Sequence, residues 1–317
     1  MTRWPGLANH NNPRETRHMT QTTPSPKSAS PAAWRRRDAL ALLGALAAPW
    51  PALAQTDLTD LARIRAAGTL KVAVYKDNAP FSDGPTSAMK GLDVSLAEAL
   101  ARQMNLKLSL LPFDAGENMG DDLRNMVWRG HYLGYGPADV MLQVPADRFL
   151  AQANPQVMIL APYVRQTIVL LHDTRKLDSA ATPEDLKGLT LAAERGAGAA
   201  SVLMGYGGGL LRNQVSIFNS GVDAAQAAVD GKAVAAFVTR AQAESVLFRN
   251  PGAAGHFRIS KLNFNNGIAD TGWPVGMAIK TAHKDLGQAL EAAMKALRDS
   301  GEMLAMFKQH GLTLAAP

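Results

Sequence analysis

The chain of 317 residues contains no cysteine, so disulfides, thiolate nucleophiles and thiolate metal ligands are excluded. Its seven histidines are scattered, and no two of them stand four residues apart, as metal ligands on one face of a helix do. The sequence also lacks a phosphate-binding loop and a nucleophile elbow. We therefore expect no metal centre and no cofactor.

An excess of positive charge is also missing once the first 54 residues are set aside. The whole chain carries 33 Lys and Arg against 27 Asp and Glu. Residues 1–54 hold seven of these basic residues and two of the acidic ones, which leaves 26 basic and 25 acidic residues and a net charge of +1 in the remainder. A nearly neutral body without a basic cluster gives no electrostatic footprint for DNA or RNA. We expect no nucleic-acid partner.

No apolar run reaches the roughly 20 residues that a membrane-spanning helix needs. The best candidate, residues 39–48, follows three arginines at 35–37 and is only about ten residues long. Ala52-Leu53-Ala54 then provides the small-x-small pattern of a signal-peptidase site. Residues 1–54 are therefore predicted to be a disordered leader with a cleaved export signal. The mature chain should begin near Gln55, in the periplasm and without a membrane span.

Two aspects of this leader stay open. Arg36-Arg37-Asp38-Ala39-Leu40 fits a twin-arginine signal, which exports folded proteins, but a general secretory signal explains the same residues. Translation can begin at Met1 or at Met19. Either choice leaves the expected compartment unchanged.

The rest of the chain alternates amphipathic segments with short apolar ones. Helical segments are expected at 58–67, 95–104 (with Asp93 as N-cap), 121–128, 183–186, 199–206, 224–229 and 286–307, the last one broken near Gly301. Strands are expected at 70–75, 107–111, 139–142, 166–171, 189–193, 215–218 and 233–238. The repeated β-α-β order predicts an α/β fold of parallel sheets with helices on both faces.

Several of these segments resemble family 3 periplasmic solute-binding proteins. Residues 75–82 and 91–100 are similar to the opening signature of that family, and residues 161–163, 186–192, 224–237 and 277–308 agree with later segments in order and spacing. The resemblance implies the two-lobe, type II periplasmic binding protein fold, in which each lobe is a sheet flanked by helices and the ligand lies in a cleft between the lobes. It places lobe 1 at 55–163 and 274–317 and lobe 2 at 164–273, with hinge crossovers near 164–167 and 267–273.

The same resemblance implies a small-molecule ligand and an ABC permease as partner. The ligand-binding positions that it implies are Asn78, Phe81, Gln143, Arg148, Gly196 and Thr239. Arg148 stands where the family has its carboxylate-binding arginine, and a solvated surface charge is the alternative. Gly196 and Gly198 would expose amide groups to an anion at a helix start, or form an ordinary turn. Because Thr239 replaces the family's ammonium-binding acid, we expect weak or no binding of α-amino acids.

Residues 128–139 contain an insertion of about five residues that is rich in glycine and aromatic residues. This segment resembles binding-protein homologues that are associated with periplasmic quinoprotein (methanol-type) dehydrogenases, and so implies an accessory role with such a dehydrogenase as partner. Trp128, Tyr132 and Tyr135 would then bind the partner, because aromatic side chains often anchor interfaces. The alternative is that these aromatic rings pack beneath their own loop.

A catalytic role is the third hypothesis, since some proteins of this fold are periplasmic dehydratases. Glu194 is the carboxylate that would act as general acid or base, and a structural ion pair with Arg195 is the alternative. We expect a binding protein rather than an enzyme.

Overall fold

The computed structural model describes residues 60–264 and 272–317, which belong to one unit of the chain, Thr56–Pro317. The predicted leader and export signal at 1–54 lie outside the described residues, and so does most of the predicted crossover at 267–273. In the two described stretches, no helix combines the length and the apolar character that crossing a membrane requires.

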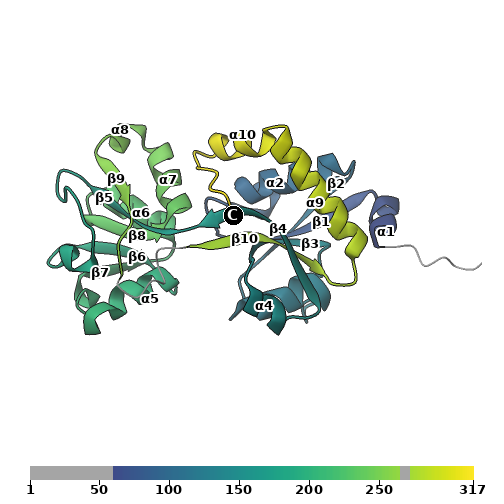
Figure 1. Ribbon diagram of the computed structural model, residues 1–317, viewed down its shortest axis with the longest axis horizontal. Coiled ribbons are helices and arrows are strands. Elements are labelled where there is room, and N and C mark those ends of the chain that lie inside the picture. The colour runs from purple at the N-terminus through teal and green to yellow at the C-terminus, as the bar shows by residue number, and fades with distance from the viewer. Residues whose placement is uncertain (1–59, 265–271) are drawn as a thin grey trace, which may run out of the picture. The chain divides into compact units, whose positions relative to one another are not determined.

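Helices and strands alternate along the described chain (Figure 1). The helices are α1 (Asp60–Ala67), α2 (Leu92–Gln103), α3 (Met119–Leu123), α4 (Arg148–Ala153), α5 (Gly198–Gly205), α6 (Gly221–Val229), α7 (Arg240–Arg249), α8 (Pro251–Ala254), α9 (Lys284–Asp299) and α10 (Glu302–Gln309). Shorter 3₁₀ or π segments are η1 (Thr86–Ala88), η2 (Arg124–Trp128), η3 (Pro183–Leu186), η4 (Tyr206–Gly208) and η5 (Arg212–Gln214).

The strands form two five-stranded sheets. They are β1 (Thr69–Tyr75), β2 (Lys107–Phe113), β3 (Val140–Pro145), β4 (Val157–Gln166), β5 (Ile168–Asp173), β6 (Leu191–Glu194), β7 (Val215–Phe218), β8 (Ala235–Thr239), β9 (Phe257–Ser260) and β10 (Trp273–Lys280). The first sheet has the order β2-β1-β3-β10-β4 and the second the order β7-β6-β8-β5-β9. We call the first sheet with its helices lobe 1 and the second sheet with its helices lobe 2.

The predicted α/β class, with two sheets flanked by helices, is confirmed, but the prediction of purely parallel sheets is wrong. In lobe 1, β10 runs antiparallel to both β3 and β4. In lobe 2, β5 runs antiparallel to β8 and β9. The two reversals have one cause: a strand that enters a sheet from the other lobe meets its neighbours from the opposite end, which a pattern of local β-α-β units does not indicate.

Lobe 1 owes much of its core to α9, whose buried residues follow the helical period. Leu286, Leu290 and Leu297 are fully buried, while the intervening charged residues of α9 stay exposed. This apolar face packs against α2 and β4, and α10 covers α2 further along (Figure 1). Gly301, in the left-handed conformation, separates α9 from α10, as predicted.

The start of α2 corrects a prediction. Gly91, and not Asp93, is the N-cap, and a Cβ at Gly91 would lie 2.2 Å from the carbonyl oxygen of Phe81. Its φ of 136° is open to glycine and strained for other residues. Asp93 instead lies in the first turn of the helix, where its side chain is fully buried. Asp93 was predicted as the cap because it is a short polar residue near a helix start, but its side chain is buried in the core.

The strand predicted at 166–171 is in fact the junction of two strands that belong to different sheets. β4 ends at Gln166 in lobe 1, β5 begins at Ile168 in lobe 2, and Thr167 alone lies between them. The predicted helix at 121–128 is α3 followed by the π-helical turn η2. The sequence analysis did not predict the helices α4, α7 and α8, the strands β9 and β10, the first part of β4, or the short segments η1 and η5.

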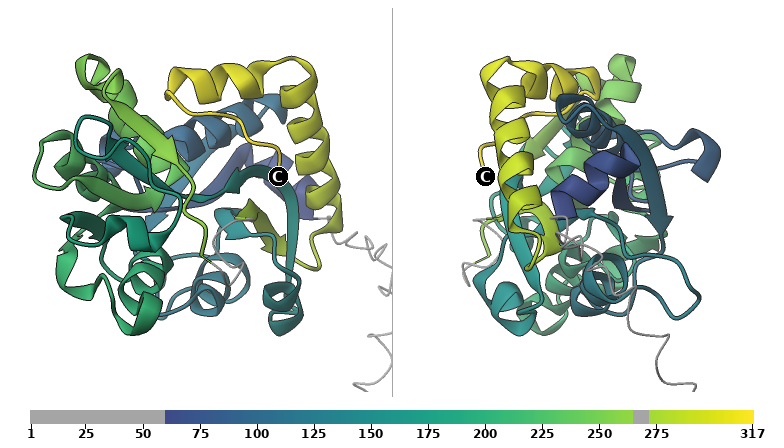
Figure 2. Two further views of the ribbon diagram at one scale, coloured as in Figure 1. Left: turned by 60° about the vertical axis from the view of Figure 1, so that its left-hand side comes forward. Right: turned by 90° about the vertical axis from the view of Figure 1, so that its right-hand side faces the viewer.

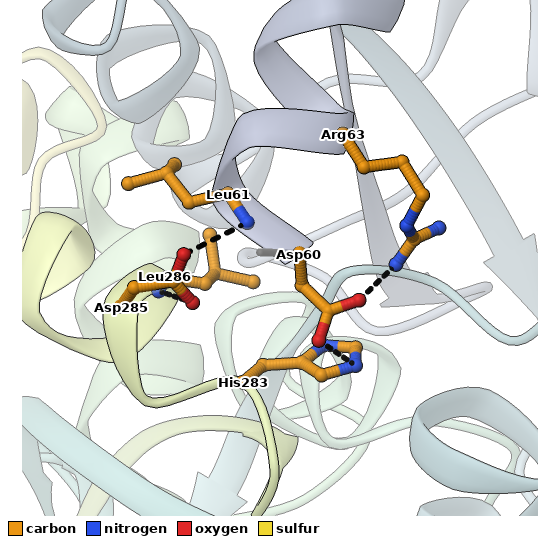
Figure 3. Close-up of polar contacts among 6 residues, drawn as sticks. All are labelled: Asp60, Leu61, Arg63, His283, Asp285 and Leu286. Carbon is orange, nitrogen blue, oxygen red and sulfur yellow. Dashed lines mark hydrogen bonds and ion pairs between the residues drawn. The ribbon is translucent and has the colours of Figure 1, made fainter. Parts of the chain in front are cut away.

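A polar junction fixes α1 to the beginning of α9 (Figure 3). Asp285 accepts hydrogen bonds from the backbone N–H of Leu61 (3.1 Å) and from that of Leu286 (2.9 Å), so one carboxylate satisfies N–H groups in the first turns of two helices. Asp60 contacts Arg63 and lies 3.0 Å from Nε2 of His283. Burial lowers the pKa of His283, so this histidine is neutral at pH 7.

The C-terminal tail connects the two lobes (Figure 2). After α10, the backbone N–H of Thr313 donates a 2.8 Å hydrogen bond to Glu244 on α7. The N–H of Arg165 on β4 donates to the carbonyl of Ala315 over 3.2 Å. Gly311 lets the tail turn beside Phe248, where a Cβ would come within 2.2 Å of the ring. Residues 311–315 therefore link the end of lobe 1 to a helix of lobe 2.

Candidate functional site: a pocket on lobe 2

A cavity of about 320 Å³ opens at the carboxyl ends of β6 and β8 in lobe 2. These two strands are parallel neighbours, and the carboxyl ends of parallel strands are where α/β proteins commonly bind ligands. The lining residues come from β5, β6, the start of α5, β8, the start of α7 and the start of β10: Ile168, Glu194, Ala197, Gly198, Ala199, Val202, Phe237, Val238, Thr239, Gln242 and Trp273. We call this cavity the lobe-2 pocket.

The local sequence explains how the two polar corners of the pocket form. β8 ends at Thr239, which is the N-cap of α7 and shares a capping box with Gln242. The N–H of Gln242 donates to Thr239 Oγ1 over 3.3 Å, and the N–H of Thr239 donates to Gln242 Oε1 over 2.9 Å. β6 ends at Glu194, and the chain turns through Gly196 (φ 71°) into α5.

The carboxylate of Glu194 is held in place by two donors. Nε2 of Gln242 donates to Glu194 Oε2 over 3.0 Å, and the backbone N–H of Gly221 donates to the same carboxylate. Burial raises the pKa of Glu194, although these two hydrogen bonds lower it, and nearby Asp223 raises it further. A Cβ on Gly221 would lie 2.1 Å from Gln242 Oε1, so the glycine lets the amide approach closely.

The chemistry of this pocket follows from its lining. Most of its walls are aliphatic or aromatic, and the polar groups are Glu194, Thr239 and Gln242. Thr239 and Gln242 already use their side chains in the cap and in the contact with Glu194. None of the described residues that line the pocket is a lysine, arginine or histidine. The pocket therefore offers an apolar space and one acidic hydrogen-bond acceptor.

The residues named by the sequence analysis fall into three groups. Thr239 lines the lobe-2 pocket, and so does Glu194, which was named only for the catalytic hypothesis. Gly196 shapes the turn beside it, while its neighbours Ala197 and Gly198 provide the lining. The remaining residues, Asn78, Phe81, Gln143 and Arg148, belong to lobe 1 and do not line this pocket.

Two of the lobe 1 residues, Phe81 and Gln143, contact one buried acid, Asp93. Phe81 is only 3% exposed, and its carbonyl accepts the N–H of Asp93 (2.8 Å). Asn78 forms an isolated bridge with Ser82. Gln143 has a φ of 60°, and its Nε2 donates to Asp93 Oδ1 over 3.3 Å.

Asp93 itself forms the centre of a compact polar cluster. The hydroxyl of Tyr163 donates to Asp93 Oδ1 over 2.9 Å, and it accepts the N–H of Gln143 over 3.2 Å. Asp93 Oδ2 has no hydrogen-bond partner among the residues that the structure describes. Burial raises the pKa of Asp93 to about 7, against the lowering effect of Tyr163 and Gln143. The cluster ties α2, β3 and β4 together.

Arg148 is the first residue of α4 and is exposed. Its N-cap, Asp147, accepts the N–H of Leu150 over 2.7 Å, and the Arg148 guanidinium lies 5.4 Å from the ring centre of Phe149, itself an exposed side chain. The helix start therefore explains the position of Arg148, and the structure gives it a cation–π contact with its neighbour.

The insertion divides its aromatic residues between core and surface. Trp128 is partly buried against the lobe 1 core, and Tyr135 stacks on His131 with ring centres 4.2 Å apart. Tyr132 is 89% exposed, and Leu133 is 67% exposed. The packing alternative thus describes Trp128 and Tyr135, while Tyr132 contacts the His131 ring (centres 4.3 Å apart) and is otherwise exposed.

Trp273, Gln242 and Gly221 were missed by the sequence analysis. Gln242 is three residues after Thr239, so the capping-box spacing was readable in the sequence. Nothing local indicates Trp273, which reaches the lobe-2 pocket from β10, over a hundred positions after Ile168. Within residues 60–264 and 272–317, no group of three or more histidine, aspartate or glutamate residues is arranged to hold a metal ion.

Comparison with known proteins identifies the fold. No protein-family model matches the chain, and no curated protein matches it. An ancestral cationic amino-acid solute-binding protein aligns with a TM-score of 0.59 at 21% identity, over 78% of this chain and 98% of its own. An amino-acid ABC transporter substrate-binding protein from Streptococcus pneumoniae, bound to L-arginine, aligns with a TM-score of 0.56 at 18% identity, over 81% and 100%.

A third structure is an ancestral amino-acid-binding protein described as a precursor of cyclohexadienyl dehydratase. It aligns with a TM-score of 0.53 at 18% identity, over 80% of this chain and 99% of its own. Identities this low define a fold and not a ligand. The chain has the two-lobe fold of periplasmic binding proteins, as the sequence analysis predicted, and none of these three structures is described as the partner of a dehydrogenase.

Proposed function

We propose that this chain is an exported solute-binding protein that captures a small molecule in the lobe-2 pocket and presents it to a membrane transporter. The observation that carries the proposal is the pocket itself. It lies at the carboxyl ends of parallel strands, it is large enough for a small ligand, and Glu194 is fixed at its wall by Gln242 and Gly221. The two-lobe fold, which serves as a receptor for amino acids in similar structures, supports the same function.

Thermal unfolding of the full chain with a library of small molecules tests this function. The library contains amino acids, primary amines, alcohols, sugars and carboxylates. A ligand at a hundredfold excess over its Kd adds about 2.7 kcal/mol to the free energy of unfolding, and so raises Tm measurably. Val202→Phe, which places a ring in the pocket, should abolish the shift. Ser201→Phe, an exposed change on the same helix, should leave it intact. If no compound raises Tm, the proposal is wrong.

Binding without turnover is the simplest use of this site. Glu194 is the single acid of the lining, and the hydroxyl of Thr239 already accepts the cap hydrogen bond of α7. General acid–base chemistry needs a group placed to receive or return the proton that the acid exchanges. The catalytic hypothesis therefore has less support than the receptor hypothesis.

The accessory role with a periplasmic quinoprotein dehydrogenase remains a second candidate, favoured by the exposure of Tyr132 and Leu133. Tyrosine offers a large contact area at low cost in conformational entropy. Tyr132→Ser with Leu133→Ser should reduce co-purification with such a dehydrogenase without changing Tm. Phe149→Ser removes a similarly exposed ring from α4 and should have no effect. Equal recovery of the dehydrogenase with both variants would exclude this surface.

A further inference from the structure

We propose that the lobe-2 pocket selects a small apolar amine, a ligand with an ammonium group on a compact hydrocarbon body and no carboxylate. The inference rests on the proposed function and specifies the ligand class of that site. It follows from the charge, the walls and the size of the pocket, each of which excludes a different group of small molecules.

The charge of the pocket favours a cation. Glu194 is the only ionisable side chain among the described lining residues. A carboxylate has about four acceptor positions, and Gln242 and Gly221 occupy two of them. An ammonium group carries three donors and would use the positions that remain, as a charge-assisted hydrogen bond. An alcohol would donate to the same oxygen without the charge.

The aromatic walls favour the same cation. Trp273 lines the pocket with 37% of its surface exposed, and Phe237 contributes a second ring. The face of an indole attracts ammonium groups, and the attraction grows when water is excluded. The aliphatic walls made by Ile168, Val202 and Val238 would receive the hydrocarbon body.

A carboxylate on the ligand meets the opposite conditions. No lysine, arginine or histidine is among the described residues of the lining, and Arg148 lies on lobe 1 and does not line this pocket. The start of α5, at Ala197 and Gly198, offers backbone N–H groups that attract anions. That attraction is set against the cost of burying a carboxylate in an apolar space and against repulsion from Glu194. An ammonium group also loses water on burial, but it gains an attraction to Glu194 that offsets this cost.

Size limits the hydrocarbon body. The cavity of about 320 Å³ lies at the lower end of the range for small-molecule sites, about 300–1,000 Å³. A branched body of four or five carbons leaves room for the ammonium group and for water. Four commercial compounds share such a body and differ only in their polar group: 3-methylbutylamine, 3-methylbutanol, leucine and 4-methylpentanoate.

Isothermal titration of the full chain with these four compounds tests the ligand class. We expect 3-methylbutylamine to bind at least about tenfold more tightly than the alcohol or leucine, since only the amine adds a charge-assisted bond without a carboxylate, and 4-methylpentanoate to bind weakest. Glu194→Gln should weaken amine binding about tenfold or more, because it removes the charge and keeps the shape. Glu291→Gln, an exposed change on α9, should leave the affinity unchanged.

The outcomes separate this inference from the proposed function. Tighter binding of leucine or of 4-methylpentanoate would overturn the amine class, and so would amine binding that persists in Glu194→Gln. The receptor function survives in these cases, because a ligand has bound. The amine class is also wrong if none of the four compounds binds. The library screen with Val202→Phe then decides separately whether the pocket is a binding site at all.

Discussion

Two acids with a raised pKa, Asp93 in lobe 1 and Glu194 in lobe 2, differ in what surrounds them. In lobe 1, Asp93 is fully buried, accepts hydrogen bonds from Tyr163 and Gln143, and does not line the lobe-2 pocket. In lobe 2, Glu194 is partly buried, has Gln242 and Gly221 as donors, and lines that pocket. Burial raises the pKa of both acids, so a raised pKa alone does not identify a binding site.

The difference lies in access to the remaining acceptor positions. Asp93 Oδ2 is buried without a partner among the described residues, so its remaining capacity faces protein. The carboxylate of Glu194, in contrast, lines the lobe-2 pocket, where its remaining acceptor positions can meet a ligand. The first acid costs stability and orders α2, β3 and β4, whereas the second costs less and is available to a ligand. This contrast makes the two acids respond differently to pH and to mutation.

The largest expected effect is the pH dependence of Asp93. Its pKa is about 7 in the folded chain, against 3.8 for an aspartate exposed to water, so folding favours the protonated form. The stabilisation is complete below about pH 4 and is lost as the pH rises through about 7, a change of about 4 kcal/mol at about 1.4 kcal/mol per pH unit. Asp93→Asn, which keeps an acceptor for Tyr163, should unfold less easily than the wild type at pH 8 and similarly at pH 4.

Denaturant unfolding of both proteins across this pH range measures the effect. The control is Asp178→Asn, an exposed aspartate of lobe 2, for which the two curves should run parallel. Parallel curves for Asp93→Asn and the wild type would show that Asp93 does not titrate with folding.

Gly91→Ala should have the next largest effect, because it disturbs the helix start that carries Asp93. The added Cβ would lie 2.2 Å from the backbone carbonyl of Phe81, and the φ of 136° is strained for alanine. We expect a loss of about 3 kcal/mol in the free energy of unfolding. Gly188→Ala also has a positive φ, yet no atom within 4 Å, so it should lose clearly less. An equal loss for both variants would mean that the close contact at Gly91 is unimportant.

Glu194→Gln should have a smaller effect on stability, and one of the opposite sign. Burial raises the pKa of Glu194, so its ionised form is a cost to the fold above that pKa and no cost below it. The variant should gain about 0.5–1 kcal/mol at pH 7, as substitutions at binding sites often do. The gain should vanish at pH 4. A loss of stability at pH 7 would instead identify the Gln242 and Gly221 contacts as the larger contribution of this carboxylate.

The smallest expected effect concerns the affinity for 3-methylbutylamine between pH 7.5 and pH 5. This amine stays protonated over the whole range, so a change reports on the protein. Because burial raises the pKa of Glu194, lowering the pH neutralises this carboxylate sooner than an exposed glutamate, and the affinity should fall. Titration at both pH values measures the ratio. The same ratio for 3-methylbutanol should stay near one, and a fall of equal size for the alcohol would contradict the charge argument.

The sequence predicted the elements whose pattern is local. The helical region predicted at 286–307, with its break near Gly301, corresponds to α9 followed by α10, and the strand predicted at 215–218 is β7. Asp93 was wrongly predicted as a cap because a buried and a capping aspartate have the same local sequence. Glu194 was noticed as a carboxylate, but its partner Gln242 is 48 residues away, and Trp273 comes from a strand beyond lobe 2. These contacts join residues that are far apart in the sequence, so a local sequence pattern does not predict them.

The hydrogen bonds of the C-terminal tail have a practical consequence for handling this protein. Within the last five residues, Thr313 forms a hydrogen bond with α7 and Ala315 forms one with β4. An affinity tag or a fluorescent fusion at Pro317 would therefore disturb the hydrogen bonds that attach the tail to both lobes. A reporter that should leave the chain undisturbed belongs elsewhere, for example at Asp178, an exposed residue of lobe 2. Conversely, a probe attached to the tail would sense any movement between α7 and β4 directly.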